Sequence, residues 1–291
     1  MSTTRAAWVE GLRLRTLTAA IAPIPVGVGA AWAEGRVDWL RAGLALIVAL
    51  GLQIGVNFAN DYSDGVRGTD ANRTGPQRLV ASGAASPAAV RAAAWAAFCV
   101  AAAAGVSLCW LSGHPWLVLV GAAAIAAAWL YTGGPRPYGY MGLGEVGVFV
   151  FFGLVAVLGT MFTQVSRVTA PAILGACGIG LLACAILMAN NIRDISADSA
   201  SGKRTAAVLL GDRVARAVYQ GELLGAFACA AAIAIWNPRA LATLLLLPSA
   251  IRLIGPVGRG ATGQDMVGVL RVTGQIELGY GVILGLALAF A

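Results

Sequence analysis

Long runs of apolar residues, separated by short polar segments, extend along the whole chain and predict nine membrane-crossing helices. Most runs are close to the roughly 20 residues that an α-helix needs to cross the hydrocarbon core of a bilayer. The expected helices cover residues 14–34, 38–62, 88–112, 115–131, 143–164, 169–192, 213–236, 239–256 and 271–290. The runs lack the apolar–polar alternation of barrel strands, which argues against an outer-membrane barrel. We therefore predict an all-α integral membrane protein with one transmembrane domain, residues 1–291.

Composition supports this fold class. Hydrophobic residues make up 59% of the chain and charged residues only 11%, which excludes an ordinary soluble domain and a disordered chain. The net charge is +7, but basic residues on a membrane protein usually serve topology and anionic head groups. We therefore expect membrane lipid, and not nucleic acid, as a partner. The five cysteines all lie in apolar runs and are expected to be small buried hydrophobes.

The basic residues also predict the orientation of the chain. With nine helices, 16 of the 20 bases fall on the side shared by the N-terminus and the even-numbered loops. The other side has four, Arg36, Arg41, Arg167 and Arg239. The positive-inside rule then places the N-terminus in the cytoplasm and the chain in the cell's inner (cytoplasmic) membrane.

Two similar segments indicate an internal repeat. Residues 59–64 (ANDYSD) and 189–194 (ANNIRD) share an asparagine and an aspartate at matching positions, 130 residues apart. Each segment follows the corresponding apolar run, with four predicted helices between them. The pattern predicts two four-helix halves of the same orientation, with a ninth helix added.

The acidic residues carry the first candidate chemistry, since 11 of the 13 fall on the cytoplasmic side. On a helix, the spacing of Gln53, Asn57, Asp61 and Asp64 places them on one face, as it does Asn191, Asp194 and Asp198. Carboxylates near hydrocarbon are costly unless something compensates their charge, and Mg²⁺ prefers oxygen ligands. Helix capping or pairing with arginines explains each acid singly, but the set favours a metal site. The expected ligands are Asp61, Asp64, Asp194 and Asp198, with Asn57, Asn60 and Asn191.

Bases and tyrosines on the same side suggest what the metal accompanies. Bases next to glycine-rich backbone suit a polyanion such as diphosphate, and the candidates are Arg15, Arg67, Arg136, Lys203 and Arg204. Arginines in short loops are also topology markers, whereas Lys203 is the only lysine. The loop from 131 to 145 adds three tyrosines, which either anchor the membrane interface or line a pocket for a flat aromatic molecule. The candidate aromatic-binding residues are Tyr131, Tyr138, Tyr140 and Gln53.

These motifs resemble the UbiA-type superfamily of intramembrane prenyltransferases. NDYSD at 60–64 is similar to the first family motif, NDxxDxxxD, although its third aspartate would fall at Gly68 and the nearest acid is Asp70. DISAD at 194–198 matches the second motif, DxxxD. The segments NDYSDGVRGTD, YTGGPRPYGYMGLGE and NNIRDISADSASGKRT most resemble members that prenylate 1,4-dihydroxy-2-naphthoate in menaquinone synthesis.

The resemblance implies a fold of nine helices around a central cavity. It also implies Mg²⁺-dependent transfer of a polyprenyl group from an allylic diphosphate to 1,4-dihydroxy-2-naphthoate, with loss of CO₂ and diphosphate. Two Mg²⁺ ions are expected, one on Asp61 and Asp64 and one on Asp194 and Asp198, with Lys203 as a further catalytic residue. On this view Asp61→Asn abolishes turnover and leaves the fold intact. The alternatives are another aromatic acceptor, such as 4-hydroxybenzoate or homogentisate, and, more distantly, a secondary transporter.

Overall fold

The computed structural model describes residues 2–69 and 78–290, and within these residues the chain is helical with no strand. The first part contains α1 (Ser2–Gly11), η1 (Leu14–Thr16), α2 (Leu17–Ile21), α3 (Pro23–Ala33), α4 (Trp39–Arg67), α5 (Pro87–Ser112) and α6 (Leu117–Leu130). The second contains η2 (Tyr138–Met141), α7 (Gly144–Val148), η3 (Phe149–Val155), α8 (Ala156–Val165), α9 (Ala170–Ala200), α10 (Ala206–Leu210), α11 (Asp212–Ile233), η4 (Pro238–Leu246), α12 (Leu247–Gly258) and α13 (Gly263–Ala289).

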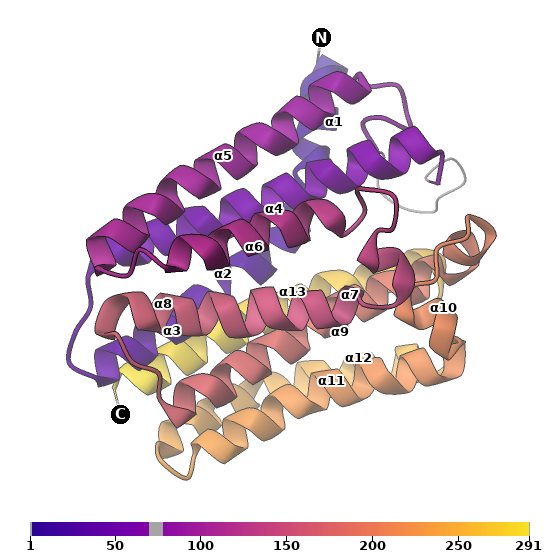
Figure 1. The fold of residues 1–291 in the computed structure, drawn as a ribbon. Helices are drawn as coiled ribbons and strands as arrows, with labels where there is room; N and C mark the ends of the chain where they lie inside the picture. Colours follow the sequence, from indigo (N-terminus) through magenta and orange to yellow (C-terminus); the bar gives the residue numbers. More distant parts are fainter. Residues whose placement is uncertain (1, 70–77, 291) are drawn as a thin grey trace.

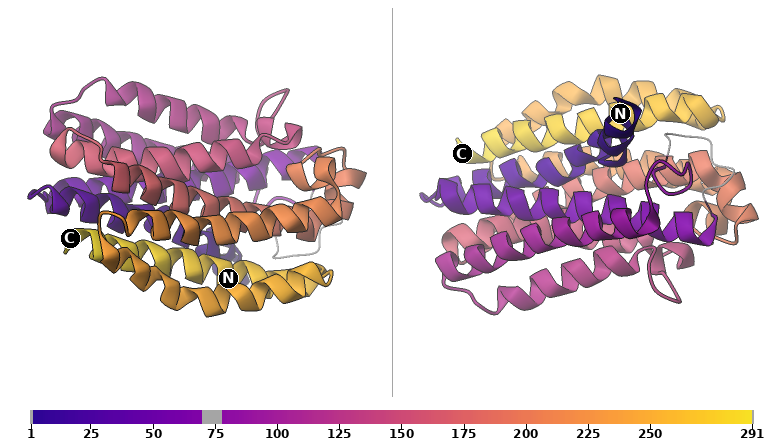
Figure 2. Two further views of the ribbon diagram at one scale, coloured as in Figure 1. Left: turned by 90° about the horizontal axis from the view of Figure 1, so that it is seen from below. Right: turned by 90° about the horizontal axis from the view of Figure 1, so that it is seen from above.

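The long helices lie side by side and run between the two ends of one bundle (Figure 1). The views from below and above show the same alignment, with the C-terminus at the end opposite α10 (Figure 2). Seven helical segments of the described chain are long and apolar enough to cross a membrane, and α6 is apolar but shorter. The chain is therefore an integral membrane protein, as its composition indicates. A count of nine crossings stays a prediction.

Local signals explain where the helices begin and end. The Asp38 carboxylate caps α4 by accepting the backbone N–H groups of Leu40 and Arg41. Ser86 caps α5 in the same way. The first predicted helix, 14–34, is instead divided at Ala22, because Pro23 cannot supply a backbone N–H and starts α3.

Two helices extend well beyond the predicted apolar runs. The run 38–62 becomes α4, which continues to Arg67, and the run 169–192 becomes α9, which continues to Ala200. A hydropathy pattern ends a predicted membrane span at the first charged residues. The helix itself continues as long as its polar residues lie on a face that packs against other parts of the chain. Both aspartate motifs therefore lie on the last turns of long helices, at one end of the bundle.

The main hydrophobic core lies among α3 and five helices of the second half of the chain, α8, α9, α11, α12 and α13. Helix α13 packs against α3 and α9 and so joins the two halves. Its contact with α3 is very close: a Cβ on Gly29 would lie 2.0 Å from the carbonyl oxygen of Gly285. Small residues permit this approach, which is a common way to pack helices in a membrane.

Candidate functional site

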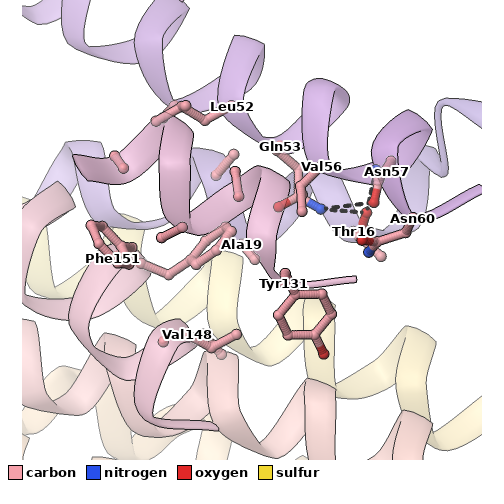
Figure 3. Close-up of a pocket in the computed structure, with 18 of the residues that line it drawn as sticks. Thr16, Ala19, Leu52, Gln53, Val56, Asn57, Asn60, Tyr131, Val148 and Phe151 are labelled. Carbon is pink, nitrogen blue, oxygen red and sulfur yellow. Dashed lines mark hydrogen bonds between the residues drawn. The ribbon is translucent and has the colours of Figure 1, made fainter. Parts of the chain in front are cut away.

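A cavity of about 1000 Å³ lies between α2–α3, α4, α5, α6, α8 and α9. Its polar end is lined by side chains from both aspartate motifs, and the rest by small and apolar residues. Figure 3 shows Asn60 and Asn57 near one end, with Val148 and Phe151 farther along. Asp64 and Ala45 both line it, and 19 helical residues separate them on α4, which corresponds to about 28 Å. The cavity therefore suits a molecule with a charged head and a long hydrocarbon part.

Asp64 and Lys203 form the centre of the polar end. The Lys203 ammonium donates to one carboxylate oxygen of Asp64 over 2.9 Å, and the Tyr140 hydroxyl donates to the other. Burial favours the neutral amine, but the charge and hydrogen bond of Asp64, together with the nearby Tyr140 and Asp198, outweigh it, so the pKa of Lys203 is raised and the side chain is a cation. Its Nζ also lies 4.9 Å from the centre of the Tyr140 ring, a cation–π distance.

Asp61, on the same helix, has different partners. Its two carboxylate oxygens accept the backbone N–H groups of Leu79 and Val80, at 2.9 and 3.0 Å. The side chain is 1% exposed, and Leu79 packs in the small cluster around Phe58. Asp61 therefore anchors the segment that leads into α5, a structural role that the spacing of the motif does not reveal.

The second motif has its own cation. Nε and an Nη of Arg193 contact the two carboxylate oxygens of Asp194 at 2.8 and 2.6 Å, and the same Nη contacts Asn190 at 2.7 Å. Asn191 turns away from this group and donates to the Glu145 carboxylate over 2.9 Å. Asn190, Asn191, Arg193 and Asp194 all line the cavity.

The N-terminal segment closes one side of the polar end. Asn57 donates to the Leu12 carbonyl and to the Thr16 hydroxyl, and Gln53 donates to the same hydroxyl over 2.9 Å. Figure 3 shows this network, in which Gln53, Asn57 and Thr16 point toward one another. Arg13 has a left-handed backbone (φ 51°), a strained conformation that is frequent at functional sites. The two amides therefore fasten the N-terminal segment to α4.

The tyrosine loop contributes to the wall of the cavity. Tyr131 and Tyr138 meet edge to face with ring centres 5.5 Å apart, and both line the cavity together with Tyr140. Burial raises the pKa of Tyr138 to about 12, so the hydroxyl is neutral at physiological pH. Arg67 holds this loop in place by donating to the carbonyls of Thr132 and Gly134.

Most of the predicted site residues come together, but three bases do not. Those that line the cavity are Gln53, Asn57, Asn60, Asp61, Asp64, Asn191, Asp194, Asp198, Lys203, Arg15, Tyr131, Tyr138 and Tyr140. Arg67, Arg136 and Arg204 are exposed and outside its lining. Asp70 lies outside the described residues. Sequence reasoning gave no site role to Thr16 or Arg193, although Arg193 directly precedes Asp194.

The donor set at the polar end fits a hard cation. Asn60 and Asp64 on α4, and Asn190, Asp194 and Asp198 on α9, all line the cavity and offer oxygen as their ligand atoms, the chemistry that Mg²⁺ prefers. Within the described residues, no three acidic, histidine or cysteine side chains already converge on one point. Mg²⁺ commonly uses one or two carboxylates and completes its shell with water and phosphate oxygens, so the set is sufficient.

Comparison with known proteins agrees with the motifs. Residues 22–256 match the model of the UbiA prenyltransferase family. The chain is 50% identical over 286 residues to the 1,4-dihydroxy-2-naphthoate octaprenyltransferase of Mycobacterium tuberculosis, covering 98% of this chain and 97% of that enzyme. It is 39% identical to the Escherichia coli enzyme of the same name, over 85% and 82% of the two chains. Among solved structures, a UbiA homologue from Archaeoglobus fulgidus bound to DMAPP and Mg²⁺ has the same fold, with a TM-score of 0.70 at 13% identity over 98% and 99% of the chains.

Proposed function

Since the chain belongs to the UbiA prenyltransferase family, we propose that this protein transfers a polyprenyl group from its diphosphate to 1,4-dihydroxy-2-naphthoate. It is a membrane-embedded prenyltransferase of menaquinone synthesis, and its reaction releases CO₂ and diphosphate and gives the reduced (quinol) form of demethylmenaquinone. The observation that carries the proposal is the cavity, in which Lys203 and both aspartate motifs meet at the end of a long apolar channel.

The polar end is the place for the diphosphate and its metal. Asp64 with Asn60, and Asp194 with Asp198 and Asn190, would each hold one Mg²⁺, while Asp61 anchors the backbone at Leu79 and Val80. Magnesium, when bound, supplies positive charge against the diphosphate as it leaves. The solved structure of the Archaeoglobus fulgidus homologue bound to DMAPP and Mg²⁺ supports the use of this metal.

The chain's own residues bind and orient the reactants. Lys203, Arg193 and Arg15 line the cavity and provide positive charge for the diphosphate oxygens. The ring faces of Tyr131 and Tyr138 are suited to the flat acceptor and to the allylic carbon, which becomes cation-like as the diphosphate departs. The electron-rich ring of the acceptor then attacks that carbon, and loss of its carboxylate as CO₂ restores aromaticity, so no strong general base is required. The apolar channel holds the isoprenoid tail and excludes water from the reactive cation.

The orientation and the extent of the domain belong to the same proposal. Nine helices would cross the inner membrane, with the N-terminus and the polar end of the cavity in the cytoplasm. The split of 16 bases to four supports this direction. A hydrophobic core that continues from α3 to α13 supports one domain over residues 1–291.

The decisive experiment incubates the purified protein with 1,4-dihydroxy-2-naphthoate, an allylic polyprenyl diphosphate and Mg²⁺, with and without EDTA. Mass spectrometry should detect the prenylated, decarboxylated quinol, or the quinone that air oxidation forms from it, and EDTA should abolish both. Transfer to 4-hydroxybenzoate or homogentisate alone would keep the reaction class and overturn the acceptor. No transfer to any acceptor would overturn the enzyme assignment, and ion flux in liposomes would then test transport.

A further inference from the structure

One carboxylate of each aspartate motif is already paired with a base of the same chain. Asp64 is paired with Lys203, which lies 139 residues away in the sequence, and Asp194 is paired with Arg193 beside it. Both pairs are well buried. The side chains of Lys203 and Asp64 are 11% and 4% exposed, and those of Arg193 and Asp194 are 4% and 6% exposed. All four residues line the polar end of the cavity.

These pairs oppose the binding of Mg²⁺ alone. The metal would approach the same carboxylates to about 2.0–2.1 Å. It would enter a site where one positive charge per carboxylate already cancels much of the attraction. It would also leave Lys203 or Arg193 as a buried cation without its partner, which is strongly unfavourable.

A diphosphate removes that penalty. Its oxygens accept from ammonium and guanidinium groups, and both bases already lie at the cavity wall. The bases then leave the carboxylates for the phosphate oxygens, and the carboxylates become available to the metal. The metal thus replaces the base as the partner of each carboxylate, while the base gains the diphosphate as its new partner. No buried ion is left unpaired in this exchange.

We propose, resting on the proposed function, that Lys203 and Arg193 are exchangeable counter-ions that make Mg²⁺ binding and prenyl diphosphate binding depend on each other. Mg²⁺ binds weakly to the free protein and tightly to the protein that holds the diphosphate. By linkage, the metal strengthens diphosphate binding by the same factor, and couplings of this kind typically amount to about 5- to 150-fold. Premature loading of the metal is thereby avoided.

The test measures metal binding directly, without turnover. Mn²⁺ replaces Mg²⁺, and the electron paramagnetic resonance signal of free Mn²⁺ is followed as the full-length protein in nanodiscs is titrated. Titrations are made without ligand and with geranyl diphosphate, no aromatic acceptor being present, and are corrected for Mn²⁺ bound by geranyl diphosphate alone. Lys203→Met and Arg193→Met each remove one counter-ion. Arg213→Met makes the same change at an exposed position on α11, outside the cavity, and serves as the matched control.

We expect geranyl diphosphate to tighten Mn²⁺ binding to the unchanged protein by about tenfold or more. Lys203→Met and Arg193→Met should bind Mn²⁺ alone about tenfold more tightly than the unchanged protein, and the gain from geranyl diphosphate should shrink in both. Arg213→Met should behave as the unchanged protein, and Lys203→Arg, which keeps the charge, should keep the weak binding.

Two negative results have different meanings. If both methionine variants are folded and bind Mn²⁺ alone no more tightly than the unchanged protein, the exchange is refuted while the proposed function stands. If the unchanged protein binds no Mn²⁺ even with geranyl diphosphate, the proposed function fails as well. The two variants lie on different motifs, so misfolding of one leaves the other to decide.

Discussion

Replacement of Asp61 by asparagine should reduce stability as well as activity, because this side chain accepts two buried backbone N–H groups. Asparagine offers one acceptor oxygen, and its amide would face the second N–H as a donor against a donor. An unsatisfied buried donor costs about 1–3 kcal/mol, and hydrogen bonds to a charged acceptor are roughly twice as strong as neutral ones. With both partners of Asp61 at or below 3.0 Å, we expect a loss of about 2–3 kcal/mol.

Hydrogen exchange measured by mass spectrometry gives the most direct assay. The amides of Leu79 and Val80 should lose protection by about 30- to 150-fold, which is the exchange equivalent of 2–3 kcal/mol. The thermal midpoint in detergent, followed by tryptophan fluorescence, should fall by roughly 5–10 °C. Asp198→Asn is the matched control, because it makes the same chemical change at a half-buried position on α9. It should lose turnover with a nearly unchanged midpoint.

The outcome decides between two roles for Asp61. If Asp61→Asn keeps both the midpoint and the protection of the two amides while turnover is lost, the anchoring role is refuted. The residue would then act only as a metal ligand, as the motif alone predicts. A fall in both quantities corrects the expectation, made from the sequence, that this substitution leaves the fold intact.

Three other features of the structure lead to predictions of their own. Gly29→Ala should lower the thermal midpoint by several degrees, since its Cβ would overlap the Gly285 carbonyl. Gly43→Ala is the control: a Cβ there meets nothing within 4 Å, so the change should be neutral or slightly stabilising. Equal midpoints for the two variants would refute the close contact. Arg216→Met should cost about 2–4 kcal/mol in denaturant unfolding, because the buried guanidinium donates to two backbone carbonyls and a carboxylate; a loss below ~0.5 kcal/mol would show that these bonds contribute little. The folded-state pKa of Tyr138, about 12, lies above its usual value of 10.0, so its contribution to stability is complete below pH 10 and is lost as the pH rises toward 12. The difference in absorbance at 295 nm between the unchanged protein and Tyr138→Phe should show one ionisation near pH 12, and an ionisation near pH 10 would contradict the burial of Tyr138.

Much of the architecture follows from one-dimensional patterns. Apolar runs of membrane length can only be satisfied as helices in lipid, because a helix pairs its own backbone groups. Helical spacing then places Asp61 and Asp64 on one face and Asp194 and Asp198 on another. Since both motifs follow apolar runs at matching places in the repeat, they were expected at the same end of the bundle, where the structure has them. The sequence by itself therefore determined the fold class, the place of the site and its oxygen-rich chemistry.

Only the tertiary structure decided which partner each of these residues has. Spacing describes neighbours along one helix, whereas Lys203 meets Asp64 across 139 residues and Asn191 turns toward Glu145. Hydropathy likewise gives the side of the membrane but not the direction of a side chain, so Arg136 and Arg204 were expected at the cavity and lie exposed outside it. Such pairings depend on how helices far apart in sequence are packed and rotated against each other. The difference between a metal ligand, an anchor and a counter-ion is set by that packing.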